Sequence, residues 1–534
     1  MNVKRICLLL IVLGTVLAGC SVKPEPYPLP PQGYAELMDA YRGAQRWTAV
    51  SRGGEMLTIE FYKWKTVSFN CSSFVVEDCT TTEPGIVGLG QDDRWMVRGE
   101  STGIRKTDPQ DKSIDVPVYI YWTEKSLTVC SSSGERMSFA YVNPEFEARL
   151  PMVNITTEGG KSITSKEDYV NGKLSIINPD NKYGFADGFS ADMKIRGRGN
   201  STWGMPKKPW KIKFNEKQCL FNMSTDKEWC LLANYTDKTY VRNIVAMELS
   251  RICGFKWTPG MVSVEVTLNG KYQGIYSFGE HKKVSKERVN IDTENGDILF
   301  EIEEQMDEPV CWWTELDVPM MFSDPSEPSQ EQISQSKKFV KDFETALKAE
   351  DYGALEKYAD LESFANNFII QELTKNIDGN LRKSSFITLE KGGRMEMYHV
   401  WDFDLSQGNA DYYGNPPGKG PQGWWVKDFG ARGKNTGWYW RLFKLEEFRK
   451  LVKERWNKLY PEFQKIPDYI DRQSRIIGEE AIARDEKAWP YSQYRSQDWW
   501  NASHTFTTYD AELDYYKKFY SERLEWMNNS INAL

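Results

Sequence analysis

Short apolar runs alternate with turn residues through the first part of the chain. The runs Met56–Phe61, Val116–Trp122 and Ser126–Cys130 each have about the length of one strand. Several short strands separated by turn signals are typical of an all-β arrangement. The sequence therefore predicts a small β-rich module over residues 34–148.

From residue 149 the pattern becomes mixed. In Trp210–Phe214 apolar side chains alternate with lysines, which predicts a strand with one apolar face. The runs 262–268 and 272–278 flank Asn269-Gly270, a dipeptide typical of a two-residue hairpin turn. We expect a β-hairpin at this position.

Helical periodicity dominates the second half. Apolar residues recur at helical spacing in 361–376, and Asp360 is suited to be the N-cap. Strand-like runs at 385–389 and 395–403 then flank a Gly392-Gly393 turn. Further helices are expected at 241–253, 331–349, 444–482 and 508–532, with a polar, proline-containing insertion at 305–330. The mixture predicts an α+β fold behind the β-rich module.

The N-terminus has the pattern of an export signal. Two positive charges precede a short apolar run that closes at Leu17-Ala-Gly-Cys20. The run is too short to be a permanent transmembrane helix, and the order resembles a bacterial lipobox. We therefore expect residues 1–20 to be a lipoprotein signal peptide, Cys20 to be lipidated, and the proline-rich residues 21–33 to form an extended tether.

That signal predicts a location in the bacterial cell envelope, with the chain bound to the membrane through its lipid anchor. Ser21 is not the aspartate that retains lipoproteins at the inner membrane, so resemblance to sorting rules favours the outer membrane. The net charge of −8 argues against nucleic acid as a main partner, because phosphate binding needs a basic surface.

Three aspartates are candidates for the chemistry. Asp378 follows a predicted helix, whereas Asp402 and Asp404 end a predicted strand on one face, about 6–7 Å apart. Two carboxylates at that spacing can share a divalent cation. Upstream, Lys211 and Lys213 project from a strand. A lysine, a base and a metal-binding acid are the parts that phosphoryl transfer requires.

An ordered set of motifs over roughly residues 150–460 resembles the CotH family of atypical protein kinases. The set comprises Arg196-Gly-Arg-Gly-Asn-Ser-Thr-Trp203, the lysine-bearing strand, Trp229–Asn234 with Asp237, Arg242-Asn243, Leu268–Tyr276 with Glu280, and Trp401-Asp-Phe-Asp404. The resemblance implies an atypical protein-kinase-like core over 149–482, with residues 483–534 as a helical segment packed on it. It also implies ATP and Mg²⁺ or Mn²⁺ as cofactors, and serine or threonine of a protein substrate as the acceptor.

Carried over to this chain, the resemblance gives Asp378 the role of catalytic base. Asp402, Asp404 and the nearby Asn380 become candidate metal ligands. Lys211 is the expected phosphate-contacting lysine, with Lys213 as the alternative. Glu280 would position that lysine, and the nucleotide side would be lined or braced by Arg196, Asn200, Asn234 and Asp237. Family members commonly carry an asparagine after the base, where this chain has Arg382-Lys-Ser-Ser385.

Two other functions are compatible with the residues. Trp424, Trp425, Trp438 and Trp440 lie in or beside a Gly-rich stretch, where exposed indoles could stack on sugars. The chain would then be a cell-surface glycan-binding or assembly lipoprotein with an inert kinase-like core; alternatively, these indoles pack the loop against helices. Asp378 with Asp402 or Asp404 could also act as the acid pair of a glycosidase.

Overall fold

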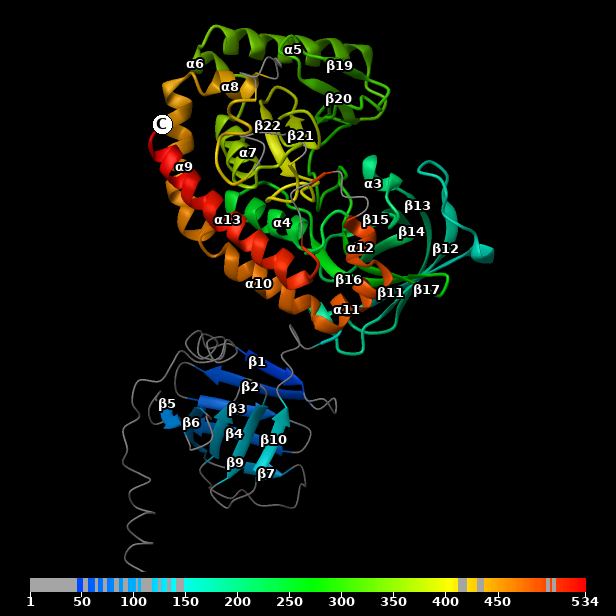
Figure 1. Ribbon diagram of the computed structural model, residues 1–534, viewed down its shortest axis with the longest axis vertical. Coiled ribbons are helices and arrows are strands. Elements are labelled where there is room, and N and C mark those ends of the chain that lie inside the picture. The colour runs from blue at the N-terminus through cyan, green and yellow to red at the C-terminus, as the bar shows by residue number, and fades with distance from the viewer. Residues whose placement is uncertain are drawn as a thin grey trace, which may run out of the picture. The chain divides into compact units, whose positions relative to one another are not determined.

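The chain divides into two compact units, residues 1–148 and 149–534 (Figure 1). The computed structural model describes residues 148–411, 420–429, 437–495, 500–501 and 506–534, together with the backbone of ten strands between residues 46 and 140. The predicted signal peptide, the lipidation site Cys20 and the tether lie outside the described residues.

The described part of the first unit is one ten-stranded sheet with antiparallel pairing. Its main path runs β1-β2-β3-β4-β6-β8-β9-β10, with β5 paired to β6 and β7 to β4. This confirms the predicted all-β module. The strands are β1 (Arg46–Val50), β2 (Met56–Tyr62), β3 (Thr66–Asn70), β4 (Phe74–Thr80), β5 (Ile86–Leu89), β6 (Trp95–Ser101), β7 (Ile104–Lys106), β8 (Val118–Trp122), β9 (Ser126–Ser131) and β10 (Arg136–Ala140).

The second unit begins with a closed barrel in the order β11-β12-β13-β14-β15-β17-β16. The barrel closes through parallel pairing of β11 with β16, and its other pairs are antiparallel. Its strands are β11 (Met152–Thr157), β12 (Val170–Ile177), β13 (Phe189–Gly197), β14 (Trp210–Cys219), β15 (Thr225–Leu232), β16 (Met261–Leu268) and β17 (Lys271–Glu280).

Local sequence explains two features of the barrel. Trp210, Ile212 and Phe214 of β14 are buried in the barrel core, as their alternation with the lysines predicts. Between β16 and β17, Asn269 and Gly270 take φ values of 50° and 77°. These left-handed angles suit the tight hairpin turn, so the predicted hairpin is confirmed.

A second sheet and a helical half follow the barrel. The sheet has the order β19-β20-β18-β21-β22. Its strands are β18 (Ile298–Ile302), β19 (Cys311–Trp313), β20 (Pro319–Asp324), β21 (Ser385–Leu389) and β22 (Met395–Val400). The stretch 305–330, predicted to be a polar insertion, therefore supplies two strands, and its apolar residues 319–322 are buried.

The helices are mostly those that the periodicity predicts. They are α3 (Ser201–Gly204), α4 (Arg242–Cys253), α5 (Gln330–Lys348), α6 (Tyr352–Leu355), α7 (Leu361–Leu373), α8 (Trp438–Leu442), α9 (Glu446–Phe463), α10 (Ile466–Ile477), α11 (Glu479–Ala488), α12 (Tyr491–Arg495) and α13 (Tyr509–Asn532). Asp360 caps α7 by accepting a hydrogen bond from Ser363 N at 3.1 Å. Position 482, the predicted end of the core, lies within α11.

The C-terminal helix α13 packs against α7 and α9 (Figure 1). Buried ion pairs join it to the core, with Arg523 bound to Glu372 on α7 at 2.6 Å and Glu512 to Arg242 on α4 at 3.3 Å. A buried charge must be paired to be tolerated, so these contacts fix α13 on the core. No helix among the described residues is long and apolar enough to cross a membrane.

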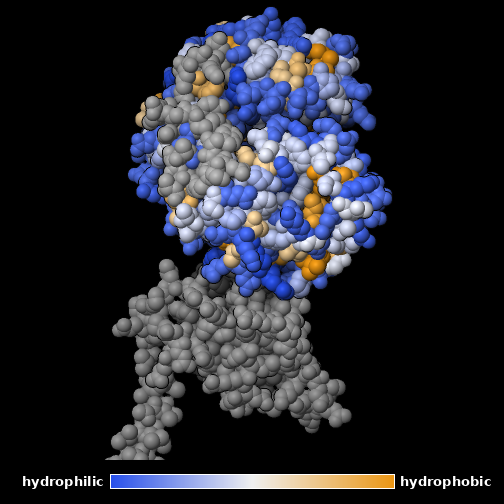
Figure 2. Space-filling model, turned by 45° about the vertical axis from the view of Figure 1, so that its right-hand side comes forward, coloured by the Kyte–Doolittle hydropathy of each residue, from blue (hydrophilic) through white to orange (hydrophobic). Residues whose placement is uncertain are grey.

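On the face of the second unit in Figure 2, hydrophilic side chains predominate and apolar ones form small, separate patches.

Candidate active site

A cavity of about 500 Å³ opens between the barrel and the second sheet, and it collects most of the predicted site residues. Its lining includes the loop before β12, the end of β13 and the loop after it, β14 and β15, and loops that follow β15, β17, β18, α7 and β22. Of the predicted residues, it includes Arg196, Asn200, Lys211, Asn234, Asp378, Asp402 and Asp404. A cavity of this size suits a small-molecule ligand.

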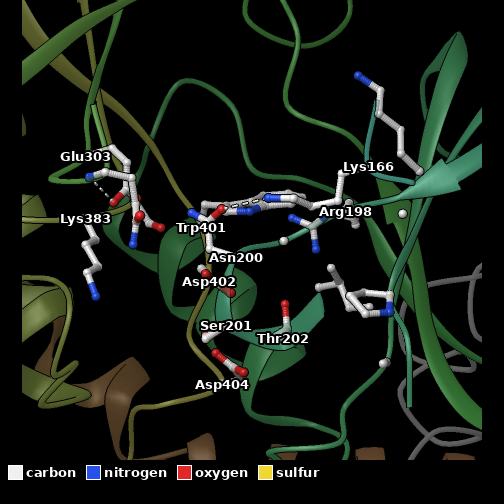
Figure 3. A pocket seen from close by; sticks show the side chains of 18 of the residues that line it. Lys166, Arg198, Asn200, Ser201, Thr202, Glu303, Lys383, Trp401, Asp402 and Asp404 are labelled. Atoms are coloured by element: carbon white, nitrogen blue, oxygen red, sulfur yellow. Dashed lines mark hydrogen bonds between the residues drawn. The ribbon is translucent and has the colours of Figure 1, made fainter. Parts of the chain in front are cut away.

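The loop between β13 and α3 covers one side of the cavity. Gly199 has a φ of +82°, and a Cβ at Gly197 would come within 2.5 Å of the Trp203 ring, so glycine is required at both positions. The guanidinium of Arg198 lies 5.6 Å from the ring centre of Trp401. Figure 3 shows Arg198 and Lys166 on one side of Trp401 and Lys383 and Glu303 on the other.

A lysine–glutamate pair forms the barrel wall. Lys211 Nζ lies 2.8 Å from Glu228 Oε2, and Lys213 Nζ lies 2.9 Å from Glu228 Oε1. Burial lowers the pKa of Lys211. Burial alone would raise the pKa of Glu228, but the ammonium groups of Lys211 and Lys213 hold it well below its usual range. Lys211 is therefore held by a carboxylate that stays charged.

That carboxylate is not the predicted Glu280. Glu280 accepts hydrogen bonds from Ser224 N and Gly260 N, each at 2.7 Å, and so ties two turns together. The β14–β15 register places Glu228 opposite Lys213. Sequence reasoning missed Glu228, although pairing β14 with the following strand would have brought it to the lysines.

Three further predicted residues lie outside the lining of the cavity as the described residues define it. Lys213 is more exposed than Lys211, with 38% of its side chain accessible against 15%. Asp237 is buried at the start of α4, where it accepts from Arg242 N at 2.9 Å and pairs with the Arg242 guanidinium at 2.5 Å. Asn380 is buried, and its Oδ1 has no hydrogen-bond partner among the described residues. Asp237 therefore braces the start of α4 from the loop before it.

The aspartates lie on loops at the opposite wall. Asp378 lies in the turn after α7, and its Oδ1 is 3.6 Å from Lys383 Nζ. The strand β22 ends at Val400, and Asp402 has a left-handed φ of 65°. The prediction that Asp402 and Asp404 share a strand face is therefore wrong, because the strand ends before them. Both nevertheless line the same cavity (Figure 3).

The turn that carries Asp402 and Asp404 is held by α4 and by the loop before α4. Asn243 Oδ1 accepts a hydrogen bond from Phe403 N at 2.7 Å, and Asp404 accepts one from the Thr236 hydroxyl. Burial, followed by the nearby charge of Asp402, raises the pKa of Asp404 to about 7. The charge of Asp402 disfavours the ionised form of Asp404, and a cation bound between them would relieve this repulsion.

The strand β18 and the loop after it add more acidic residues to the lining of the cavity. Glu301 binds Lys282 with both carboxylate oxygens, while Glu303 accepts a hydrogen bond from Gln305 N at 3.2 Å. Burial raises the pKa of Glu303 to about 7. Asp307 and Glu308 also line the cavity.

The tryptophans considered for sugar binding mostly serve packing. Trp425 and Trp438 are 2% and 0% exposed. Trp424 is half-buried, with its ring centre 5.0 Å from that of Trp526 on α13. Trp440 is half-buried beneath the ammonium of Lys444. The packing interpretation therefore accounts for this cluster.

Within the described parts of the chain, no group of three or more His, Cys, Asp or Glu side chains is arranged to hold a metal ion. A cation between Asp402 and Asp404 can take further ligands from a bound molecule or from water. Mg²⁺ sites of kinases are commonly built in this way, from one or two carboxylates and substrate phosphates.

A barrel with a carboxylate-held lysine, facing a helical half with loop aspartates, defines a kinase-like domain. The family model described as CotH kinase protein matches residues 195–527. Because this match covers more than half of the chain, the chain belongs to the CotH kinase family, as the sequence motifs predict. No curated protein matches the chain.

Proposed function

We propose that the second unit is a protein kinase that transfers the terminal phosphoryl group of ATP to a serine or threonine hydroxyl of a protein. The observation that carries the proposal is the shared cavity, which places Lys211 on one wall and Asp378, Asp402 and Asp404 on the other. Membership of the CotH kinase family supports the same reaction.

The residues fit a divalent cation bound together with a nucleotide. Asp402 and Asp404 supply two carboxylates, and the raised pKa of Asp404 is a mark of negative charge that the surroundings do not compensate. Mg²⁺ or Mn²⁺ would neutralise the phosphates of ATP and hold them against these acids. Asn380 is a further predicted ligand, although its buried side chain lies outside the cavity lining in the described structure.

Each wall then has a separate role. Lys211, oriented by Glu228, donates hydrogen bonds to phosphate oxygens from the barrel side. The loop from Arg196 to Thr202 offers Arg198, Asn200 and hydroxyl groups to the same ligand. Asp378 accepts the proton of the acceptor hydroxyl at the opposite wall. Positioning and charge stabilisation of this kind provide most of the catalysis in phosphoryl transfer.

The proposal is tested by incubating the purified full-length chain with labelled ATP, Mg²⁺ or Mn²⁺, and casein as a general acceptor. We expect label in casein or in the chain itself, and its loss in Asp378→Ala and Asp402→Ala. Absence of transfer, together with absence of a nucleotide-dependent thermal shift, would contradict the proposal.

A glycan-binding lipoprotein with an inert core is the alternative. The burial of Trp425 and Trp438 removes two of its four proposed contacts, so no structural observation favours it. Glycan binding that survives Asp378→Ala and Asp402→Ala but disappears in Trp424→Ala would support it over the kinase.

We further propose that the kinase is anchored in the bacterial cell envelope through lipid on Cys20, at the outer membrane. The support is the Leu17-Ala-Gly-Cys20 sequence and the residue that follows it. Metabolic labelling with palmitate should mark the wild-type chain but not Cys20→Ala. Labelling that persists in Cys20→Ala would overturn the anchor.

A further inference from the structure

The Arg242-Asn243 pair at the start of α4 is a predicted motif whose role the proposed function leaves open. The guanidinium of Arg242 is fully buried and is paired with the carboxylates of Asp237 and Glu512. These ion pairs hold α4 to the rest of the fold. Asn243 is the second residue of α4 and, unlike Arg242, lines the cavity. Its side chain can therefore reach a ligand there.

Only one end of the Asn243 amide is hydrogen-bonded within the described structure. Its Oδ1 accepts the hydrogen bond from Phe403 N at 2.7 Å. Because only the oxygen of an amide can accept from an N–H group, this bond fixes which end faces Phe403. The other end, Nδ2, donates to no described residue, although Asn243 is only 3% exposed. A buried donor without an acceptor costs free energy, which a bound acceptor would recover.

The neighbouring carboxylates do not take this donor. The turn that carries Asp402 and Asp404 lies against Asn243, because the residue between the two aspartates donates to its Oδ1. The oxygens of Asp404 accept instead from the Thr236 hydroxyl and from Leu405 N. Asp402 is exposed and accepts no hydrogen bond from a described residue. The Nδ2 group is thus left for an acceptor that enters the cavity.

A phosphate oxygen is the acceptor that fits this position. An amide N–H group is a donor only, so Nδ2 cannot itself be a ligand of a cation held by Asp402 and Asp404. Mg²⁺ sites that have one or two carboxylates are completed by phosphate oxygens of the substrate. Those phosphates would lie beside the turn that Asn243 contacts. One phosphate group can bind the cation through one oxygen and accept from Nδ2 through another.

We propose that Asn243 binds the nucleotide by donating a hydrogen bond from Nδ2 to a phosphate oxygen of ATP. This inference rests on the proposed function. The bond from Phe403 N to Oδ1 orients the amide, so one side chain both holds the acidic turn and contacts the phosphates. The two contacts can be separated by substitution. Asn243→Asp keeps an oxygen that can accept from Phe403 N and removes the Nδ2 donor.

The test compares Asn243→Asp and Asn243→Leu with wild type in the full-length chain. Leucine has nearly the same size as asparagine but can form neither hydrogen bond. The matched control is Asn367→Asp, because Asn367 is a buried asparagine on α7 whose Oδ1 accepts from the Tyr439 hydroxyl at 2.8 Å. Two quantities are measured: the Kd of ATP by calorimetric titration, with Mg²⁺ and with a chelator, and the hydrogen-exchange rate of the Phe403 amide.

We expect Asn243→Asp to raise the Kd of ATP about 10–100-fold, with and without Mg²⁺, as is usual for the loss of a hydrogen bond to a charged group. Exchange of the Phe403 amide should stay slow in this variant, because its acceptor oxygen remains. Asn243→Leu should raise the Kd at least as much and should also speed the exchange at Phe403. Asn367→Asp should change neither quantity.

Four results would overturn the inference. A Kd within about threefold of wild type in Asn243→Asp would show that Nδ2 does not contact ATP. A raised Kd together with fast Phe403 exchange in Asn243→Asp would show that Asn243 acts only through the turn. A raised Kd in Asn243→Asp but not in Asn243→Leu would indicate charge repulsion. A raised Kd confined to Mg²⁺ would place Nδ2 against water on the cation.

The inference and the proposed function can fail separately. A wild-type chain that binds ATP but transfers no phosphate overturns the proposed function and leaves the contact from Asn243 in place. A wild-type chain that binds no ATP overturns both.

Discussion

The two walls of the cavity balance their charges in different ways. On the barrel wall, Lys211 and Lys213 share Glu228 between two regular strands. On the opposite wall, Asp402, Asp404 and Glu303 stand on loops, and the pKa values of Asp404 and Glu303 are raised to about 7. The two lysines of the barrel wall are paired with a carboxylate, whereas the carboxyl groups of Asp404 and Glu303 have raised pKa values.

The difference separates what supports the fold from what is left for a ligand. A compensated ion pair on strands can hold its geometry before any ligand arrives. Uncompensated carboxylates reduce stability, and they are kept where a bound cation or a proton in transfer relieves them. Substitutions on the acidic wall should therefore affect activity more than stability.

The largest effect is expected for Asp402→Asn. Transfer should fall about 10³-fold, because one of the two carboxylates for the cation is lost. The free energy of unfolding should not fall, since Asp402 raises the pKa of Asp404 and its removal relieves that repulsion. Asp317→Asn is the matched control, because Asp317 is also exposed and has a φ of 66°. If Asp402→Asn lost stability but kept phosphoryl transfer, Asp402 would support the fold and not the activity.

The next effect concerns pH and Glu303. Its pKa is raised from 4.5 to about 7, so the folded chain binds more protons than the unfolded chain between these values. Stability should therefore fall as pH rises through this window, by about 3 kcal/mol from this group. The free energy of unfolding is measured with denaturant at pH 5, 6, 7 and 8. The difference between Glu303→Gln and wild type should move in favour of the variant as pH rises. If the free energies of unfolding of wild type and Glu303→Gln changed equally with pH, the raised pKa of Glu303 would be contradicted.

Substitutions of two barrel glutamates should have different effects, one on kcat and the other on stability. Glu228→Gln should lower kcat about 10-fold or more, because Lys211 loses the charge that orients it. Glu280→Gln should destabilise the fold by about 1–3 kcal/mol, because the amide cannot accept both backbone hydrogen bonds, and should keep kcat within about threefold. Transfer assays and unfolding curves for both variants test this. A large loss of kcat in Glu280→Gln, with kcat unchanged in Glu228→Gln, would show that Glu280 positions Lys211.

The smallest effect is expected for Lys213→Met. Lys213 lies outside the cavity lining of the described structure and is half-exposed, and Lys211 remains paired with Glu228 when Lys213 is removed. Transfer should change by less than about threefold and stability by less than about 1 kcal/mol. A kcat loss as large as that of Lys211→Met would show that both lysines contact the ligand.

Much of the fold could be predicted because its signals are local. The β14 strand follows from alternation, the β16–β17 hairpin from Asn269-Gly270, and the α7 start from the Asp360 cap. The strands β19 and β20 were not predicted, because their short apolar runs are flanked by polar residues and β19 has only three residues. Such short strands are defined by their partners more than by their own pattern.

The site was predictable in part. The motifs bring Asp378, Asp402, Asp404 and Lys211 to one cavity, as expected. The lysine's partner depends on which strand pairs with β14, and the orientation of Asp402 depends on a left-handed turn after Val400. The first follows only once β14 is paired with the next strand, and the second is set by tertiary contacts such as the hydrogen bond from Phe403 N to Asn243.

The central claim is that the acidic wall takes a divalent cation together with the phosphates of ATP. Calorimetric titration of ATP into wild type and Asp402→Asn, with Mg²⁺ or with a chelator, tests it directly. The account predicts that Mg²⁺ tightens ATP binding to wild type at least about tenfold, or about 1.4 kcal/mol, and has little effect on Asp402→Asn. Equal ATP affinity of wild type with and without the metal would contradict it.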